Sequence, residues 1–265
     1  MQDPIGSGLY LGASIIDHSC SPNAIWICNG KELVIRSIEK IDDFSAVRIS
    51  YISKLYEKTE KRREKLMKMY YFQCKCSNCL NEMNNQMKSA LKCPQCSGCV
   101  PVSRGSCIDC NHHVTKSNIE QHKILRSQFL KSFENFTLDQ EFFEKSVEIF
   151  HPYDQDFMRI LKTNYKFQKS GENYENCLFI LRLTLENLRK NLPLYYDVIG
   201  LTEISTSEIC IKLNLLEEAE MHINKAEEIF RVTHGINHSL ITSGCSKIRR
   251  DINVKTKVQA KHNLE

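Results

Sequence analysis

The pattern of apolar and polar residues changes near residue 117, and beyond it the spacing is helical. The clearest unit is a hairpin of two predicted helices, 201–213 and 216–235, with a turn at Asn214. Apolar residues recur every three or four positions in the second helix, which predicts one buried face. This face consists of Ala219, Ile223, Ala226, Ile229 and Phe230. Gly235 is a helix stop signal.

An earlier segment, 171–193, aligns loosely with the second helix of this hairpin. Glu175 and Glu218 then match at a spacing of 43 residues, which is compatible with a tetratricopeptide-like repeat. Stacked hairpins of this kind form a concave surface that contacts proteins or peptides. We therefore expect a tetratricopeptide-like domain over 117–254, with a protein partner on its repeats, and a frayed polar tail over 255–265.

Upstream of residue 117 the runs of regularly spaced apolar residues are shorter and more irregular. The stretch IIDHSCSPNA (15–24) is apolar up to Ile16 and then becomes polar. In ISYIS (49–53) the alternation predicts a strand with Ile49 and Tyr51 on the same face. Taken alone, a tyrosine in such a strand is more often a packed aromatic than a reactive group.

Composition narrows the class of protein. The chain has 265 residues, 42% hydrophobic and 26% charged, which is typical of a soluble globular protein. Its net charge of +4 is too small to indicate a nucleic-acid partner. MQDPIGSGLY is not a signal peptide, and no apolar run approaches the roughly 20 residues of a membrane span. We expect an intracellular protein with no membrane association and with reduced thiols.

Thirteen cysteines are many for such a chain, and ten of them lie between Cys20 and Cys110. Four have apolar neighbours and no partner nearby, so we expect them to be small buried side chains. These four are Cys28, Cys177, Cys210 and Cys245. The other nine are clustered, which indicates metal binding.

The first cluster lies in YYFQCKCSNCL (70–80), which contains Cys74, Cys76 and Cys79. Three thiolates in six residues suit one tetrahedral Zn²⁺, which takes four nitrogen or sulfur ligands in a structural site. The fourth ligand must come from elsewhere in the chain. The alternative is an exposed patch of reduced cysteines that is open to oxidation.

The second cluster lies in LKCPQCSGCVPVSRGSCIDCNHHV (91–114) and has two C-x-x-C knuckles at turn residues, typical of a zinc ribbon. The knuckles consist of Cys93, Cys96, Cys107 and Cys110. Three spare donors leave the fourth ligand open: Cys99, His112 and His113. A ribbon can also bind nucleic acid, but the only basic residues between Lys92 and His113 are Lys92 and Arg104. We therefore favour a structural role, without direct nucleic-acid binding.

Five segments occur in the order found in SET-domain lysine methyltransferases. Among these enzymes the chain most closely resembles the SET-and-MYND (SMYD) family. They are DHSCSPNA (17–24), ELVIRSI (32–38), ISYIS (49–53), EKRREKLMKMYYFQCKCSNC (60–79) and RVTHGINHSLI (231–241). The resemblance implies an α+β fold. It places a partial SET β-fold with its post-SET zinc site in 1–80, a linker and zinc-ribbon-like insert in 81–116, and the all-α helical domain in 117–254.

The resemblance also implies the roles of individual residues. Cys20 would be the fourth ligand beside Cys74, Cys76 and Cys79. Tyr51 would be the catalytic tyrosine, and four residues would contact S-adenosylmethionine: Asp17, His18, Tyr70 and Phe72. The implied activity is methylation of lysine in a protein or peptide substrate, a histone or another protein. The family implies chromatin-linked roles in the nucleus and the cytoplasm.

The chain departs from the family at Asp17, where the family usually has Asn. A carboxylate accepts hydrogen bonds but cannot donate one, and its charge should weaken binding of the cofactor carboxylate. The first half of the SET domain and the MYND finger have no counterpart in these residues, so we expect an incomplete methyltransferase. The alternative is a non-catalytic, zinc-stapled interaction module built on the helical repeats.

Overall fold

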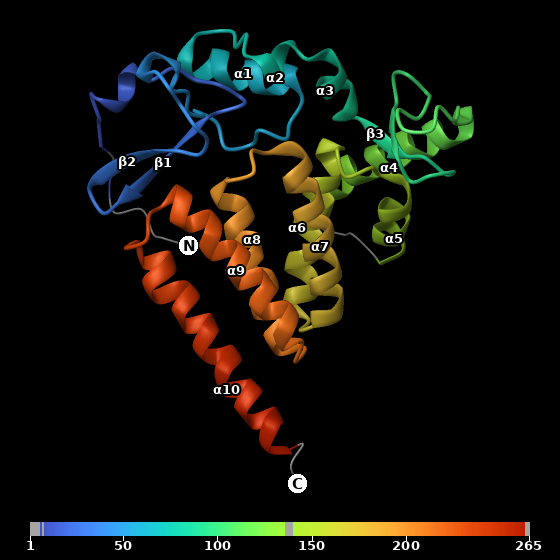
Figure 1. Cartoon of the computed structure of the whole chain (residues 1–265). Helices are drawn as coiled ribbons and strands as arrows, with labels where there is room; N and C mark the ends of the chain where they lie inside the picture. Colours follow the sequence, from blue (N-terminus) through green and yellow to red (C-terminus); the bar gives the residue numbers. More distant parts are fainter. Residues whose placement is uncertain (1–5, 7, 136–139, 263–265) are drawn as a thin grey trace. The chain divides into compact units, whose positions relative to one another are not determined.

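The computed structural model describes residues 6, 8–135 and 140–262. Its elements are mostly helices, with a few short strands, which confirms the predicted α+β class (Figure 1). Contacts divide the chain into two units, Met1–Ser53 with Leu66–Ser77 and Leu192–Glu265, and Lys54–Lys65 with Asn78–Asn191. Two of the four boundaries run inside helices α1 (Thr59–Tyr70) and α2 (Ser77–Leu80). None of the described helices has the length and apolar character that crossing a membrane requires.

The first unit contains one antiparallel hairpin, β1 (Ala24–Asn29) and β2 (Glu32–Ser37). Asn29 pairs with Glu32, so only two residues form the turn, and Gly30 adopts the positive φ of +61° that such tight turns require. Single turns of 3₁₀-helix flank the hairpin, η1 (Ala13–Ile15) and η2 (Phe44–Ala46). The small core beneath it is formed by Ile16, Ala24 and Ile49, with Tyr51 packed against them.

The predicted strand over 49–53 is replaced by an isolated parallel bridge between His18 and Ile49. The Ser50 hydroxyl gives the physical reason. It donates to the Ile52 carbonyl (2.7 Å) and accepts from the Ile52 N–H (3.3 Å). Local side-chain bonds of this kind compete with a β-ladder for the same backbone groups.

The remainder of the first unit is helical: α8 (Asp197–Lys212), α9 (Leu216–Thr233), a π-helical turn η3 (Leu240–Cys245) and α10 (Ser246–His262). Helices α8 and α9 lie side by side as the predicted hairpin (Figure 1). All five residues of the predicted apolar face are buried, which confirms that prediction. Gly235 follows α9 with a φ of +88°.

The expectation that the tail frays from residue 255 is wrong as far as His262, because α10 includes these residues. Ile248 and Ile252 anchor the preceding turns in the core. The Lys255 ammonium then donates to the Ile211 carbonyl (2.7 Å) near the end of α8. Such a bond satisfies a carbonyl that has no partner inside its own helix.

After its parts of α1 and α2, the second unit continues with α3 (Glu82–Met87) and a two-stranded sheet, β3 (Ala90–Lys92) with β4 (Cys99–Pro101). Four helices follow: α4 (Lys116–Asn135), α5 (Gln140–Ile149), α6 (Gln155–Ser170) and α7 (Tyr174–Asn191). Their core is rich in phenylalanine, with Phe129, Phe150 and Phe157 fully buried. Asp154 caps α6 through the Asp156 N–H (2.8 Å) and contacts the buried His122 imidazole (3.1 Å).

Gly200 sets how closely α8 approaches α9. A Cβ atom at this position would lie 2.8 Å from the Phe230 ring and 3.2 Å from Ile229. We predict that Gly200→Ala lowers the stability by about 1–2 kcal/mol. Overpacking of a core should outweigh the gain of about 1 kcal/mol in helix propensity. Thermal unfolding followed by circular dichroism measures the change.

The matched control is Gly171→Ala, where the nearest atoms would lie 3.8 Å from the new Cβ and φ is −87°. This control should leave the unfolding temperature almost unchanged. A Gly200→Ala variant as stable as the control would contradict the close approach of α8 and α9.

Candidate functional site

His18 links the polar segment around Cys20 to the segment that carries Tyr51. The Tyr51 backbone N–H donates to His18 Nδ1 (3.0 Å), so this nitrogen acts as an acceptor. The proton of the neutral ring is therefore on Nε2. This atom lies 3.2 Å from Cys20 Sγ, and the imidazole is only 9% exposed. His18 thus presents an N–H donor to the cysteine sulfur.

Tyr51 lies at the centre of a group of rings. Its ring centroid is 5.3 Å from His18, 4.9 Å from Tyr70 and 6.3 Å from Phe72. Its hydroxyl donates to the Ile16 carbonyl (2.5 Å). Partial burial raises the pKa of Tyr51, and the nearby Asp17 and Tyr70 raise it further. The hydroxyl is therefore neutral at physiological pH, and its oxygen retains lone pairs for a further donor.

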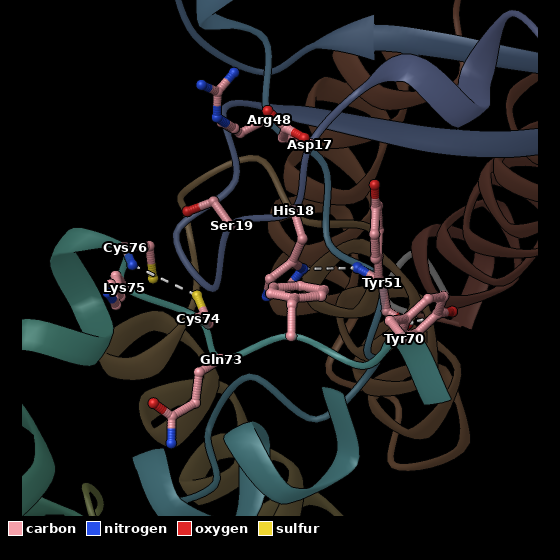
Figure 2. A pocket seen from close by; sticks show the side chains of 11 residues that line it. Asp17, His18, Ser19, Arg48, Tyr51, Tyr70, Gln73, Cys74, Lys75 and Cys76 are labelled. Atoms are coloured by element: carbon pink, nitrogen blue, oxygen red, sulfur yellow. Dashed lines mark hydrogen bonds between the residues drawn. The ribbon is translucent and has the colours of Figure 1, made fainter. Parts of the chain in front are cut away.

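A cavity of about 540 Å³ lies beside these rings (Figure 2). All four predicted cofactor residues line it together with Tyr51: Asp17, His18, Tyr70 and Phe72. In Figure 2 His18 lies in the middle of the view, with Tyr51 and Tyr70 on one side of it and Cys74 and Cys76 on the other. The residues that the resemblance implied therefore meet at one place, although they come from three separate segments.

Several polar residues that the sequence did not single out line the same cavity. Two of them are cationic, Arg48 and Lys75, and the others include Ser19 and Gln73. The Arg48 guanidinium is held by the carbonyls of Ser45 (2.7 Å) and Val47 (2.8 Å). Ser19, Gln73 and Lys75 lie inside the quoted segments, but the resemblance assigned no role to them, and Arg48 lies outside these segments.

The chain turns sharply at Tyr71, which follows α1 with a φ of +59°. A bulky side chain in this left-handed region is uncommon. Tyr71 itself is 84% exposed, whereas Tyr70 and Phe72 on either side of it both line the cavity. The turn brings two aromatic residues that are nearly adjacent in sequence to the same cavity.

The sulfur atoms of Cys20, Cys74, Cys76 and Cys79 all lie within 4.8 Å of one another. Cys79 lies two residues beyond Ser77 and is positioned by the short helix α2. The Cys20 and Cys74 sulfurs are 4.0 Å apart. Zinc–sulfur bonds of about 2.3 Å in a tetrahedron would separate the sulfurs by about 3.8 Å. The cluster thus has the donor type and the spacing that a structural zinc ion requires.

Two buried side chains donate to sulfurs of this cluster. His18 lies against Cys20. The Arg62 guanidinium, 1% exposed, donates to the Cys79 sulfur (3.4 Å) and to the Thr59 hydroxyl (3.2 Å). Donors of this kind stabilise the thiolate form that a metal ion requires. The sequence did not single out Arg62, because it is one of several basic residues on the same helix.

The four cysteines of the second cluster also lie within 4.8 Å of one another. The sulfur distances are 3.7 Å from Cys93 to Cys110, 3.6 Å from Cys96 to Cys107, and 3.3 Å from Cys96 to Cys110. The three spare donors are outside this group. The geometry therefore favours an all-cysteine set, and no disulfide forms among the cysteines of the described residues.

The two knuckles of the second cluster have the same backbone pattern. Cys93 N–H donates to the Gly98 carbonyl, and Cys107 N–H donates in the same way to the His112 carbonyl. The residues directly after the second cysteine of each knuckle both have a positive φ, 58° at Ser97 and 59° at Asn111. The two knuckles therefore present their cysteines from the same type of turn.

Of the four cysteines expected to be buried, Cys28 is exposed, so that prediction is wrong for this residue. It lies on β1, where burial alternates from Ile25 to Cys28 and places Cys28 on the exposed face with Trp26. Cys177, Cys210 and Cys245 are buried as expected.

No family model matches the chain. Curated proteins do match over most of its length. Histone-lysine N-methyltransferase ASHR1 of Arabidopsis thaliana is 26% identical over 258 residues, covering 88% of this chain and 53% of that protein. Histone-lysine N-methyltransferase SMYD3 of Homo sapiens is 24% identical over 237 residues, covering 89% and 51%. N-lysine methyltransferase SMYD2 of Homo sapiens is 23% identical over 248 residues, covering 94% and 55%.

This chain is similar to SMYD-type lysine methyltransferases over most of its length. It spans about half the length of the curated SMYD relatives that it matches. The comparison agrees with the two cysteine clusters, whose geometry suits zinc. The resemblance that was based on short motifs therefore extends over about nine-tenths of the chain.

We predict that Cys20→Ser lowers the zinc content by about one equivalent, because a four-coordinate structural site rarely survives loss of a thiolate. Zinc per chain, measured by plasma mass spectrometry on the purified protein, tests this. The matched control is Cys28→Ser, since Cys28 is exposed and belongs to neither cluster. Equal zinc content in the two variants would exclude Cys20 as a ligand.

Proposed function

We propose that this chain forms the carboxyl-terminal part of a SMYD-type protein-lysine N-methyltransferase. The single observation that carries the proposal is the convergence of Tyr51, His18, Tyr70 and Phe72 on one cavity beside a four-cysteine cluster. Relatives whose names describe histone-lysine and protein-lysine methyltransferases support it over the non-catalytic interaction module. A lysine side chain of a histone or another protein would be the substrate.

When bound, S-adenosylmethionine supplies an electrophilic methyl group on a sulfonium. Transfer to a lysine would form a carbon–nitrogen bond and break the carbon–sulfur bond, leaving a neutral thioether, and the nitrogen would release a proton to solvent. The protein must therefore align the two reactants and favour the neutral amine. The ordinary lysine pKa is about 10.4, so the amine must enter surroundings that disfavour its charge.

Tyr51 meets both requirements. Its proton is already donated to the Ile16 carbonyl, so its oxygen can accept a hydrogen bond from the lysine nitrogen and orient the nitrogen lone pair. Its raised pKa keeps the hydroxyl neutral. A phenolate would instead stabilise the lysine ammonium and oppose the reaction. Tyr70 and Phe72 contribute apolar ring surface that excludes water from the same cavity.

The charged residues of the cavity suit the amino-acid end of the cofactor. Lys75 and Arg48 line the cavity and can neutralise a carboxylate. Asp17 is exposed on the same cavity, and its negative charge opposes a carboxylate bound there. The two cations fit one end of the cofactor, and we infer no partner for its adenine.

We infer that each of the two cysteine clusters binds one zinc ion. In the first cluster the ligands would be Cys20, Cys74, Cys76 and Cys79, and the metal would pin the segment of Tyr70 and Phe72 over His18 and Tyr51. In the second cluster they would be Cys93, Cys96, Cys107 and Cys110, forming a zinc-ribbon-like insert. Metal binding can supply folding free energy that a small apolar core lacks.

The helical part completes the proposal. We infer a tetratricopeptide-like arrangement of its hairpins that offers a surface to a protein partner or to the substrate. A chromatin-linked role in the nucleus and the cytoplasm is part of the same inference. It rests on the names of the relatives, two of which specify histone lysine.

The chain can be tested as it stands and as a fusion behind an amino-terminal segment of human SMYD3. We predict that Tyr51→Phe lowers methyl transfer in the fusion about 100-fold or more. Loss of one oriented polar group at a reacting centre commonly has this effect. Transfer of radiolabelled methyl groups to histones measures the rate.

The matched control is Tyr195→Phe, which removes a hydroxyl that contacts Glu228 at an exposed position outside the cavity. This control should retain the full rate. Full activity of Tyr51→Phe would reduce Tyr51 to a packing residue. A folded, zinc-loaded fusion without any transfer would contradict the proposed function.

A second prediction concerns Asp17. Asp17→Asn should tighten S-adenosylmethionine binding about five-fold, because an amide donor to the carboxylate contributes roughly 1 kcal/mol and a negative charge is removed. Isothermal calorimetry on the fusion measures the dissociation constant. Weaker binding would mean that the Asp17 carboxylate pairs with the cofactor ammonium instead.

A further inference from the structure

A third group of metal-binding side chains lies between α8 and α9, in a part of the molecule that the proposed methyl transfer does not use. The donor atoms of Cys210, Glu218 and His222 all lie within 4.8 Å of one another. Cys210 is in the last turn of α8, and Glu218 and His222 are one turn apart on α9. Because α8 and α9 pack side by side, the three side chains converge from two facing helices (Figure 1).

The orientation of His222 is the decisive feature. Its Nδ1 lies 2.5 Å from a carboxylate oxygen of Glu203, which is buried on α8. This contact places the ring proton on Nδ1 and leaves the lone pair on Nε2. A carboxylate behind the distal nitrogen is the usual partner of a histidine that binds a metal.

The other ring nitrogen has no hydrogen bond, although the imidazole is only 6% exposed. Nε2 of His222 is buried without a hydrogen-bond partner. The nearest carboxylate oxygen, on Glu218, is 3.5 Å from this nitrogen. This distance is close to the separation of two ligand atoms that bind the same metal ion. A buried nitrogen lone pair without a donor is costly. A cation between these groups would satisfy it.

The interface between α8 and α9 contains further polar groups. Ser207 on α8 is fully buried and donates to the Ala219 carbonyl of α9 (2.7 Å). Gly200, one turn before Glu203, removes side-chain bulk from the same interface. The interior of the hairpin therefore contains a polar stripe on α8 opposite the apolar face of α9.

We propose that Cys210, Glu218 and His222 form a third site for a divalent transition-metal ion, with zinc as the best match. One thiolate, one imidazole and one carboxylate together neutralise a 2+ charge and suit tetrahedral coordination, in which water takes the fourth position. Glu203 acts as the positioning residue that holds the His222 ring. The Glu218 side chain, 24% exposed, gives the ion a route from solvent.

Cobalt(II) is the probe, because its visible spectrum distinguishes tetrahedral from octahedral coordination. The full chain is first loaded with zinc and then dialysed until it retains two equivalents per chain, which fill the four-cysteine clusters and leave the third group empty. Cobalt(II) added afterwards should produce tetrahedral absorption bands that saturate at one equivalent. Glu203→Gln should weaken this binding about 10–100-fold without abolishing it.

Cys210→Ala and His222→Gln should each abolish the tetrahedral bands. The matched control is Cys245→Ala, a cysteine of the same unit that is 1% exposed and lies outside the group. Circular dichroism checks folding. Glu218→Gln, at the partly exposed ligand, provides a milder test and should weaken cobalt binding if the buried variants do not fold.

Two results would overturn the proposal. One is a folded wild-type chain that gives no tetrahedral cobalt spectrum after zinc loading. The other is a spectrum that persists unchanged in Cys210→Ala, His222→Gln and Glu218→Gln, since the ion would then be bound elsewhere.

Discussion

The candidate site depends on four sulfur atoms that must share one small volume. Cys20 is 54 residues from Cys74, and closing so long a loop costs conformational entropy that a few contacts cannot easily offset. A divalent cation among four thiolates can offset it, because each ligand bond is strong and directional. The segment fixed in this way continues into Phe72 and Tyr70. An ion in the cysteine cluster would therefore help to hold Tyr70 and Phe72 against Tyr51.

The two four-cysteine clusters use different means to support their sulfurs. In the first, the cysteines come from distant segments, and the side chains of His18 and Arg62 donate to them in addition to the backbone N–H of Cys76. In the second, the cysteines are close in sequence, and backbone groups contribute, such as the Asp109 N–H on Cys107. A side chain at Gly98 would collide there with the Asp109 carboxylate.

The hairpin of α8 and α9 shows how a helical core can hold polar groups. Gly200 permits close packing against Phe230, while Ser207 and Glu203 find partners on the opposite helix. A buried polar group is tolerated only when such partners exist. The proposed ion between the helices would complete this network at His222, the one position where a buried nitrogen lacks a hydrogen bond among the described residues of the hairpin.

Local patterns in the sequence were sufficient for features that depend on local physics. The apolar face of α9, the helix stop at Gly235 and the two knuckles of the second cluster follow from spacing alone, because their partners are a few residues away. Resemblance to SMYD proteins connected Cys20 with Cys74, a pairing that no spacing rule could supply. Tertiary structure decided the remainder. The Ser50 hydroxyl binds backbone groups that would otherwise extend a strand, and Lys255 belongs to an ordered helix because its ammonium reaches a carbonyl of α8. The third group of metal-binding side chains likewise forms only when α8 and α9 pack together. Such contacts depend on packing between segments, and periodicity along one segment carries no information about them.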